Sequence, residues 1–195
     1  MSRQRIGVLA SQGDFEAHAA MLRSLDAEPS EVRVPDGLDG LDGLVIPGGE
    51  STTITKALAR DGLDEAIRGY AAAGGSILGT CAGMIMLDRD HLGLMDVRAE
   101  RNAFGRQRQS FEADLEVAGL GPEPLRAVFI RAPWISESGE GVEVLAGLEG
   151  HPVVVREGRL LACAFHPELT DDSRMHALFM AIAGSDRNKS GSRAL

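Results

Sequence analysis

The sequence has few cysteines, few aromatic residues and no long apolar run, and each shortage excludes a class of protein. The two cysteines, Cys81 and Cys163, are too few for a disulfide framework, so we expect a reduced, cytoplasmic protein. No stretch is long enough to cross a bilayer, and no apolar signal region follows residues 1–5. A formal net charge of −9 argues against nucleic acid or an acidic membrane as a partner.

The first half of the chain alternates apolar, strand-like segments with helical ones. We expect strands at 5–10, 31–34, 41–46 and around Ile77-Leu78, separated by helices at 15–25, 53–59 and 63–73. Ser51 or Thr52 is the expected N-cap of the helix at 53–59. This alternation predicts an α/β fold with a doubly wound, mostly parallel sheet. Functional loops then lie at the carboxyl ends of the strands.

The second half changes character, because Gly-rich connections separate short strands with only partial alternation. The expected strands lie at 94–100, 109–117, 127–131, 142–146, 152–156 and 160–165, and the last helix at 173–183. These strands predict antiparallel additions to the sheet. We expect a single domain over residues 1–183, followed by a polar, disordered tail at 184–195.

The stretch Gly79-Thr80-Cys81-Ala82-Gly83 indicates a nucleophile at the corner between a strand and a helix. Gly-x-Cys-x-Gly is the cysteine form of the nucleophile elbow, in which a strained turn exposes the reactive atom. A thiol at a helix N-terminus also lies near the positive end of the helix dipole, which favours the thiolate. The alternative is that Cys81 is an ordinary buried cysteine.

Among the five histidines, only His166 directly follows an apolar strand, and Glu168 lies two residues further on. An imidazole that takes the thiol proton, with a carboxylate that orients the ring, would complete a triad with Cys81. Alternatively, His166 is a loop histidine and Glu168 a solvated charge. Cys163, inside the preceding strand, fits a small core residue. The cysteines and histidines lack zinc-ligand spacing, so we expect no metal site.

Several motifs in order carry a resemblance over residues 6–182. They are Gln12-Gly13, Pro47-Gly48-Gly49-Glu50-Ser51-Thr52-Thr53, the elbow at 79–83, Arg101-Asn102-Ala103-Phe104-Gly105-Arg106-Gln107 with Ser110-Phe111-Glu112, Phe129-Ile130-Arg131-Ala132-Pro133, and Phe165-His166-Pro167-Glu168-Leu169-Thr170. Together they resemble the glutaminase subunits of pyridoxal 5′-phosphate synthase, which are class I (triad) glutamine amidotransferases of flavodoxin-like fold. The elbow and His-Pro-Glu are shared by the wider class, whereas the stretches at 48–53, 101–107 and 130–133 are narrower and point to these subunits.

The resemblance implies hydrolysis of L-glutamine to L-glutamate and ammonia, without a metal or organic cofactor, and delivery of ammonia to a synthase subunit. It implies Cys81 as nucleophile, His166 as general base and acid, and Glu168 as the orienting carboxylate. The implied oxyanion hole is made by the backbone N–H groups of Gly49 and Ala82. The implied glutamine contacts are Gly49, Glu50, Ser51, Arg101, Ile130 and Arg131. Without the motifs, both arginines would pass as solvated charges.

The chain departs from the family pattern in two places. Ser11 stands where a larger apolar residue is expected, in the loop that the resemblance places against the synthase. The connection from Met86 to His91 is shorter than expected, although Arg101 must still reach the site from it.

Three alternatives remain open from the sequence. A glutaminase subunit of another amidotransferase, such as one for histidine biosynthesis, would share the triad but not the narrower motifs. A catalytically silent regulatory subunit would not need the intact triad. A cysteine peptidase of related fold would have less use for Glu50 and Arg131, which suit a free amino acid.

Overall fold

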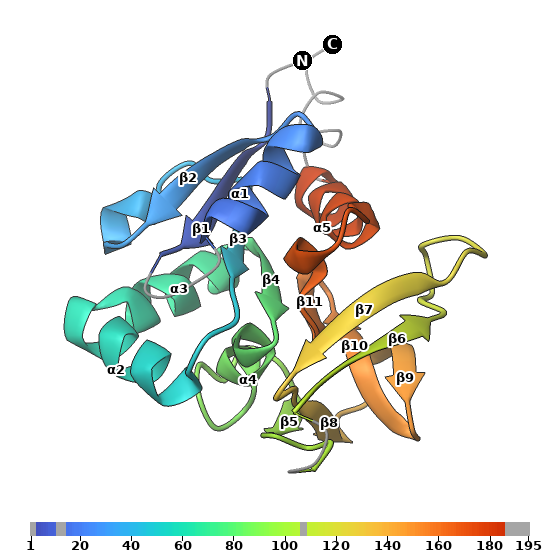
Figure 1. Cartoon of the computed structure of the whole chain (residues 1–195). Coiled ribbons are helices and arrows are strands. Elements are labelled where there is room, and N and C mark those ends of the chain that lie inside the picture. The colour runs from blue at the N-terminus through green and yellow to red at the C-terminus, as the bar shows by residue number, and fades with distance from the viewer. Residues whose placement is uncertain (1–2, 11–14, 106–108, 186–195) are drawn as a thin grey trace.

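The fold is built on a seven-stranded sheet in the order β2-β1-β3-β4-β11-β10-β9 (Figure 1). The structure is a computed structural model that describes residues 3–10, 15–105 and 109–185. The first five strands in this order run parallel to their neighbours, whereas β10 and β9 are antiparallel additions. The strands are β1 (Arg5–Leu9), β2 (Glu28–Val32), β3 (Gly43–Ile46), β4 (Ser76–Thr80), β9 (Glu143–Leu148), β10 (His151–Glu157) and β11 (Leu160–Cys163).

In the described part of the chain, five α-helices connect and cover the strands. They are α1 (Phe15–Ser24), α2 (Ser51–Asp61), α3 (Leu63–Ala72), α4 (Ala82–Leu87) and α5 (Arg174–Gly184), with the short 3₁₀ turns η1 (Pro35–Leu38) and η2 (Pro167–Leu169). Figure 1 shows α1 and α5 side by side, although they come from opposite ends of the chain. In the described residues, no helix combines the length and the apolar character that a membrane span requires.

Two separate two-stranded sheets flank the end of the main sheet where β4 and β11 finish. β5 (Val97–Glu100) pairs with β8 (Trp134–Ser138), and β6 (Ser110–Leu115) pairs with β7 (Leu125–Ile130). Aromatic contacts join the β6-β7 pair to the segment after β11, because the Phe129 ring stacks on Phe111 at 4.8 Å and meets Phe165 edge to face at 5.6 Å between ring centroids. The two small sheets thus enclose the carboxyl ends of the parallel strands.

The predicted α/β class is confirmed, and the order β2-β1-β3-β4-β11 is that of flavodoxin-like sheets. The predicted position of β2 was wrong, because the strand is Glu28–Val32 and not 31–34. β2 is an edge strand, where Pro29 and charged residues are tolerated, so its sequence gives no apolar signal. β8 was missed, since only its first two residues, Trp134 and Ile135, are apolar. Helix α5 runs to Gly184, and residues 186–195 of the expected tail lie outside the described residues.

Two glycines let α4 pack directly on the sheet. A Cβ at Gly83 would overlap the carbonyl oxygen of Ile46 at the end of β3, and one at Gly79 would lie 2.5 Å from the carbonyl oxygen of Gly83. Every residue of α4 is buried, which is why this helix is apolar all round. The backbone of α4 therefore approaches β3 and β4 more closely than any side chain would allow.

This packing predicts opposite effects for the same substitution in two helices. Gly83→Ala forces α4 away from β3, so we expect it to lower the free energy of unfolding by about 1–3 kcal/mol. Gly69→Ala in α3 is the control, because its Cβ would meet nothing within 4 Å. There, the higher helix propensity of alanine should stabilise the protein by up to about 1 kcal/mol. Urea denaturation of both variants measures the difference, and equal midpoints would contradict the close approach.

Candidate active site

Cys81 occupies the corner between β4 and α4. Its backbone has φ 50° and ψ −108°, a conformation that residues other than glycine seldom adopt. Its N–H donates to the carbonyl of Cys163 at 2.8 Å, and its Sγ lies 3.7 Å from the carbonyl oxygen of Ile130. The predicted elbow is therefore present, with the strain that such turns carry.

His166 lies between Cys81 and Glu168, so the structure brings the three predicted residues together. The ring Nδ1 donates to Oε1 of Glu168 at 2.7 Å, and the ring hydrogen bonds with the thiol of Cys81. Its backbone N–H donates to the carbonyl of Val128 at 2.9 Å, which fixes the loop after β11 to β7. Burial alone lowers the pKa of His166, but the hydrogen bonds with Cys81 and Glu168 raise it to about 10. This environment stabilises the protonated imidazolium of His166 beside the Cys81 sulfur.

A cavity of about 310 Å³ opens above Cys81 at the carboxyl ends of the strands. It is lined by Gly49, Glu50, Ser51, Cys81, Ala82, Ile85, Arg101, Asn102, Ile130, Arg131, Pro133 and His166. All the predicted site residues except Glu168 are in this lining. Glu168 stays behind His166, as an orienting carboxylate should.

Glu50 caps helix α2 from the rim of the cavity. Its carboxylate accepts hydrogen bonds from the backbone N–H groups of Thr52 at 3.0 Å and Thr53 at 2.7 Å. The Thr53 hydroxyl and these N–H groups lower the pKa of Glu50 to about 2. The predicted cap, Ser51 or Thr52, was wrong, because α2 begins at Ser51 itself. The Ser51 hydroxyl is buried and has no hydrogen-bond partner within the described part of the chain.

Arg101 reaches the cavity despite the short connection that precedes it. Its Nη2 lies 3.0 Å from Oε1 of Glu50, and its Nη1 donates to the Thr52 hydroxyl at 3.4 Å. The guanidinium therefore spans the mouth of the cavity and neutralises the Glu50 charge there. It remains about half exposed, so a ligand can compete for it.

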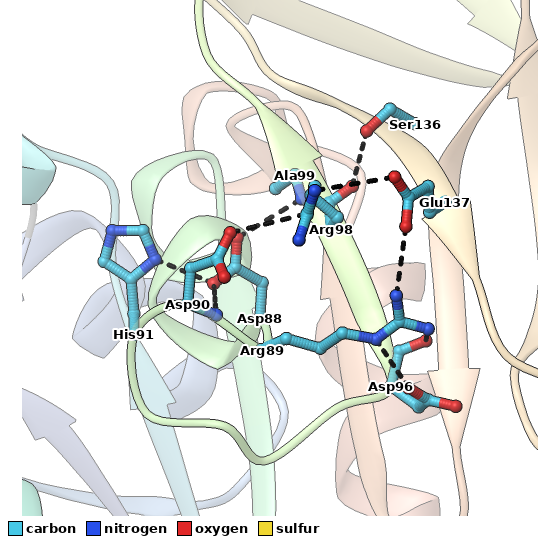
Figure 2. Close-up of polar contacts among 9 residues, drawn as sticks. All are labelled: Asp88, Arg89, Asp90, His91, Asp96, Arg98, Ala99, Ser136 and Glu137. Carbon is cyan, nitrogen blue, oxygen red and sulfur yellow. Dashed lines mark hydrogen bonds and ion pairs between the residues drawn. The ribbon is translucent and has the colours of Figure 1, made fainter.

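Figure 2 shows how the connection between α4 and β5 is held by Asp88. This carboxylate is 1% exposed, and one oxygen accepts from the N–H of Asp90 and from Nδ1 of His91. The other oxygen accepts from the N–H of Ala99 at 3.2 Å. Since Ala99 lies two residues before Arg101, this buried carboxylate fixes the strand that carries the arginine.

Ion pairs on the outer side join the same connection to β8 (Figure 2). Arg89 contacts Asp96 at 2.6 Å and Glu137 at 3.2 Å, and Arg98 contacts Glu137 at 3.6 Å. Exposed pairs of this kind contribute little individually, but together they restrict the loop. The buried Asp88 is the stronger constraint.

Arg131 and Ile130 close the opposite wall, at the end of β7. Arg131 has φ 44°, and its N–H donates to the carbonyl of Gln109 at 2.6 Å. This turn directs the chain from β7 towards β8. It leaves the carbonyl of Ile130 beside the thiol of Cys81.

Four cavity or near-cavity residues were missed from the sequence. Ile85, Asn102 and Pro133 line the cavity. A Cβ at Gly48 would lie 2.5 Å from Cε1 of His166, so this glycine makes room for the ring. Asn102, Pro133 and Gly48 lie inside motifs already singled out, which was the signal available. Ile85 follows the elbow by one helical turn.

In the described ranges, no three His, Cys, Asp or Glu side chains form a group that could hold a metal ion. The loop at Ser11, Gln12 and Gly13, with its predicted role towards a partner, lies outside the described residues, as do Arg106 and Gln107.

The family model of the SNO glutamine amidotransferase family matches residues 8–183. The protein named pyridoxal 5′-phosphate synthase subunit PdxT from Frankia alni is 52% identical over 194 residues, which cover 95% of this chain and 98% of that one. The protein of the same name from Thermus thermophilus is 52% identical over 188 residues, covering 92% and 97%.

Solved structures give the same result. A crystal structure of a glutamine amidotransferase superposes with a TM-score of 0.87 at 48% identity, covering 92% of this chain and 98% of that one. The structure of PurLQS from Thermotoga maritima has a TM-score of 0.72 at 18% identity, covering 92% and 98%, and supports the fold alone.

The His166–Glu168 contact predicts a shift that NMR can measure. Glu168→Gln keeps the shape of the side chain but removes the negative charge beside the imidazolium, so the pKa of His166 should fall by one unit or more, on the order of 1.4 kcal/mol per unit. A pH titration of the His166 ring signals measures this. Glu137→Gln, an exposed carboxylate on β8, is the control and should leave the titration unchanged. An unaltered His166 pKa in Glu168→Gln would remove Glu168 from the triad.

Proposed function

The chain belongs to the SNO glutamine amidotransferase family, and we propose that it hydrolyses L-glutamine to L-glutamate and ammonia and passes the ammonia to a pyridoxal 5′-phosphate synthase subunit. The observation that carries the proposal is His166, held between the Cys81 thiol and the Glu168 carboxylate at the floor of the cavity. We assign Cys81 as nucleophile, His166 as general acid and base, and Glu168 as the orienting carboxylate.

In the proposed reaction, the Cys81 thiolate forms a bond to the side-chain amide carbon of glutamine. The tetrahedral intermediate then collapses, its C–N bond breaks, and His166 gives its proton to the departing nitrogen, which leaves as ammonia. His166 next takes a proton from water, which attacks the thioester. The C–S bond breaks, and glutamate leaves while the thiolate is restored. The triad completes this cycle without a metal or organic cofactor.

The developing oxyanion would lie against the backbone N–H groups of Gly49 and Ala82. Both residues line the cavity next to Cys81, and Ala82 directly follows the nucleophile. Gly49 has φ 146°, a region open to glycine but strained for other residues. The glycine loop is therefore suited to present an N–H where a side chain would interfere.

The remaining lining fits a free amino acid. The arginines Arg101 and Arg131 suit the α-carboxylate of glutamine, and backbone carbonyls such as that of Ile130 suit its α-amine. Glu50 holds Arg101 in place, and the buried Ser51 hydroxyl offers a further polar contact. A cavity of about 310 Å³ matches a single amino acid better than a peptide.

The synthase partner is proposed because relatives with 52–53% sequence identity to this chain carry the name pyridoxal 5′-phosphate synthase subunit. The narrower motifs, including Gly49-Glu50-Ser51 and Ile130-Arg131, favour this partner over the amidotransferase of another pathway. We place the reaction in the cytoplasm, where the two free cysteines stay reduced. We propose a single domain over residues 1–183 and no role for nucleic acid or a membrane.

The two cysteines should respond differently to the same substitution. Cys81→Ala removes the nucleophile and should lower glutamine turnover by roughly 10³-fold or more while the fold stays intact. Cys163 is the matched control. Burial, followed by the nearby Glu168 and Cys81, raises its pKa well above the ordinary thiol range, so it stays protonated in the core. Cys163→Ala should retain most of the turnover. Glutamate release in the presence of synthase measures both, and near-normal turnover of Cys81→Ala would refute the assignment.

We also expect the chain to be a poor glutaminase alone and a good one in complex. Neither Gly48 nor Gly49 has a Cβ, so the peptide between them can rotate. One orientation presents an N–H to the oxyanion and the other a carbonyl oxygen, and one missing oxyanion donor lowers turnover by about 10²–10³. A bound synthase can select the productive orientation. Steady-state glutamate production, titrated with synthase, tests this; full activity that stays flat through the titration would contradict it.

The Gly49→Ala variant tests the contribution of the glycine loop independently of synthase binding. Since φ 146° strains an alanine, this variant should stay slow even when synthase is saturating. Gly69→Ala, in the open part of α3, is the control and should titrate like the unchanged protein.

A further inference from the structure

Two histidines that the proposed reaction does not use are buried directly behind the triad. His18 comes from α1 and His176 from α5, and both are 0% exposed. Nδ1 of His18 lies 2.9 Å from Nε2 of His176, a hydrogen-bond distance. Polar rings are costly to bury, so a pair of them in the core needs a partner that repays the loss of water.

That partner is the second oxygen of the Glu168 carboxylate. Oε1 is taken by His166, whereas Oε2 is buried and makes no well-aligned hydrogen bond within the described chain. Nε2 of His18 lies 3.3 Å from Oε2 and 3.4 Å from the hydroxyl of Thr80, the residue before Cys81. Glu168 therefore lies between two imidazoles: Oε1 faces His166 and Oε2 faces His18.

We propose that His18, held by His176, is a positioning residue for the triad: its Nε2–H engages Oε2 of Glu168 and thereby keeps Oε1 directed at His166. The proposal rests on the proposed glutaminase function and adds two residues to its site. Its basis is the juxtaposition of α1, α5 and the turn η2, three elements that meet only in the folded chain.

The hydrogen-bond directions agree along the row when Nε2 of His18 carries the proton, which the Thr80 hydroxyl, 3.4 Å away, can also accept. An ionised carboxylate only accepts, so His18 must donate from Nε2. Its Nδ1 then accepts from the Nε2–H of His176. The Nδ1 of His176 is left as a bare lone pair, which agrees with its lack of a hydrogen-bond partner in the described structure. No ring in the row needs a second proton.

Both added histidines stay neutral in this arrangement. Burial, together with the neighbouring His176 and His166, lowers the pKa of His18 well below its ordinary value, and burial lowers that of His176 to about 4. The contact between His18 and Glu168 is therefore a neutral donor on a carboxylate, not an ion pair. A charged His18 would compete with His166 for the Glu168 charge, whereas a neutral one orients the carboxylate and leaves its charge to the His166 imidazolium.

The titratable groups around this row are few. His18 faces His176 from α5, Glu168 from η2 and, at longer range, His166. Glu168 faces these rings and the buried thiol of Cys163 from β11. Among the described residues, no other charged group shifts the pKa of His18 or His176.

Two substitutions that differ by one methylene separate positioning from packing. His18→Gln places an amide N–H₂ near the position of Nε2, so it can still donate to Glu168. His18→Asn places the amide near Nδ1, within reach of His176 only. His18→Leu removes both contacts while keeping bulk. His151→Leu is the control for a histidine away from the triad, where the ring stacks on Trp134.

The first readout is the pH dependence of Cys81 alkylation by iodoacetamide, followed by mass spectrometry at Cys81. Without the His18 donor, Glu168 supports the His166 imidazolium less well, so the thiolate forms at higher pH. His18→Asn and His18→Leu should move the acidic limb upward by about one unit. His18→Gln and His151→Leu should keep the profile of the unchanged protein.

The second readout is steady-state glutamine turnover with saturating synthase. His18→Asn should lower kcat roughly tenfold and leave KM nearly unchanged, because glutamine itself does not touch His18. His18→Gln should recover most of kcat. His176→Leu should act in the same direction with a smaller effect, since it removes only the support of His18.

Either of two results would overturn the proposal: equal kcat losses in His18→Gln and His18→Asn, or an unshifted alkylation limb in His18→Asn. Should His18→Leu fail to fold, the Gln and Asn pair still decides. An unchanged protein that releases no glutamate with synthase would instead refute the proposed function, and the alkylation profile would still test His18.

Discussion

The site depends on one close approach, that of the α4 backbone to the end of β3. Because Gly83 has no side chain, α4 can lie against the carbonyl of Ile46 directly after the strained turn at Cys81. The hydrogen bond from Cys81 N–H to the Cys163 carbonyl, 2.8 Å, then ties the corner to β11. Three neighbouring strands thus finish together, and the glycine loop, the proposed nucleophile and the proposed base each follow one of them. The pairing of β3, β4 and β11 is enough to bring the glycine loop, Cys81 and His166 together.

Two carboxylates serve the site in different environments. Glu168 is buried and accepts a hydrogen bond from His166. The hydrogen bonds of His166 with Cys81 and Glu168 raise the pKa of His166 to about 10. Glu50 is exposed at the rim, where the first-turn donors of α2 lower its pKa to about 2 and Arg101 balances its charge. The first therefore contacts the proposed general base, and the second holds an arginine over the mouth of the cavity.

The sequence was informative where function is encoded locally. The elbow, the strand before His166 and the glycine loop are short contiguous patterns, so their residues could be placed at the ends of parallel strands from the order of amino acids alone. The cap of α2 was assigned wrongly because Ser51 and Thr52 are typical cap residues and glutamate is not, whereas here the Glu50 carboxylate accepts from the N–H groups of Thr52 and Thr53. The shifted β2 and the missed β8 are short strands whose pairing, not their composition, makes them strands.

His18 and His176 lie beyond what a sequence pattern can reveal, because their meaning comes from a contact across 158 positions of the chain. In a helical pattern, His18 merely shares the buried face with Ala19 and Leu22. The same burial that suppresses their ionisation also lowers the local dielectric, which strengthens each interaction of Glu168. A carboxylate that accepts from a neutral donor at one oxygen and from an imidazolium at the other is held in one orientation. Its negative charge then stabilises the imidazolium alone. That directionality, not additional charge, is what the ends of the chain supply to the triad when α1 and α5 pack together.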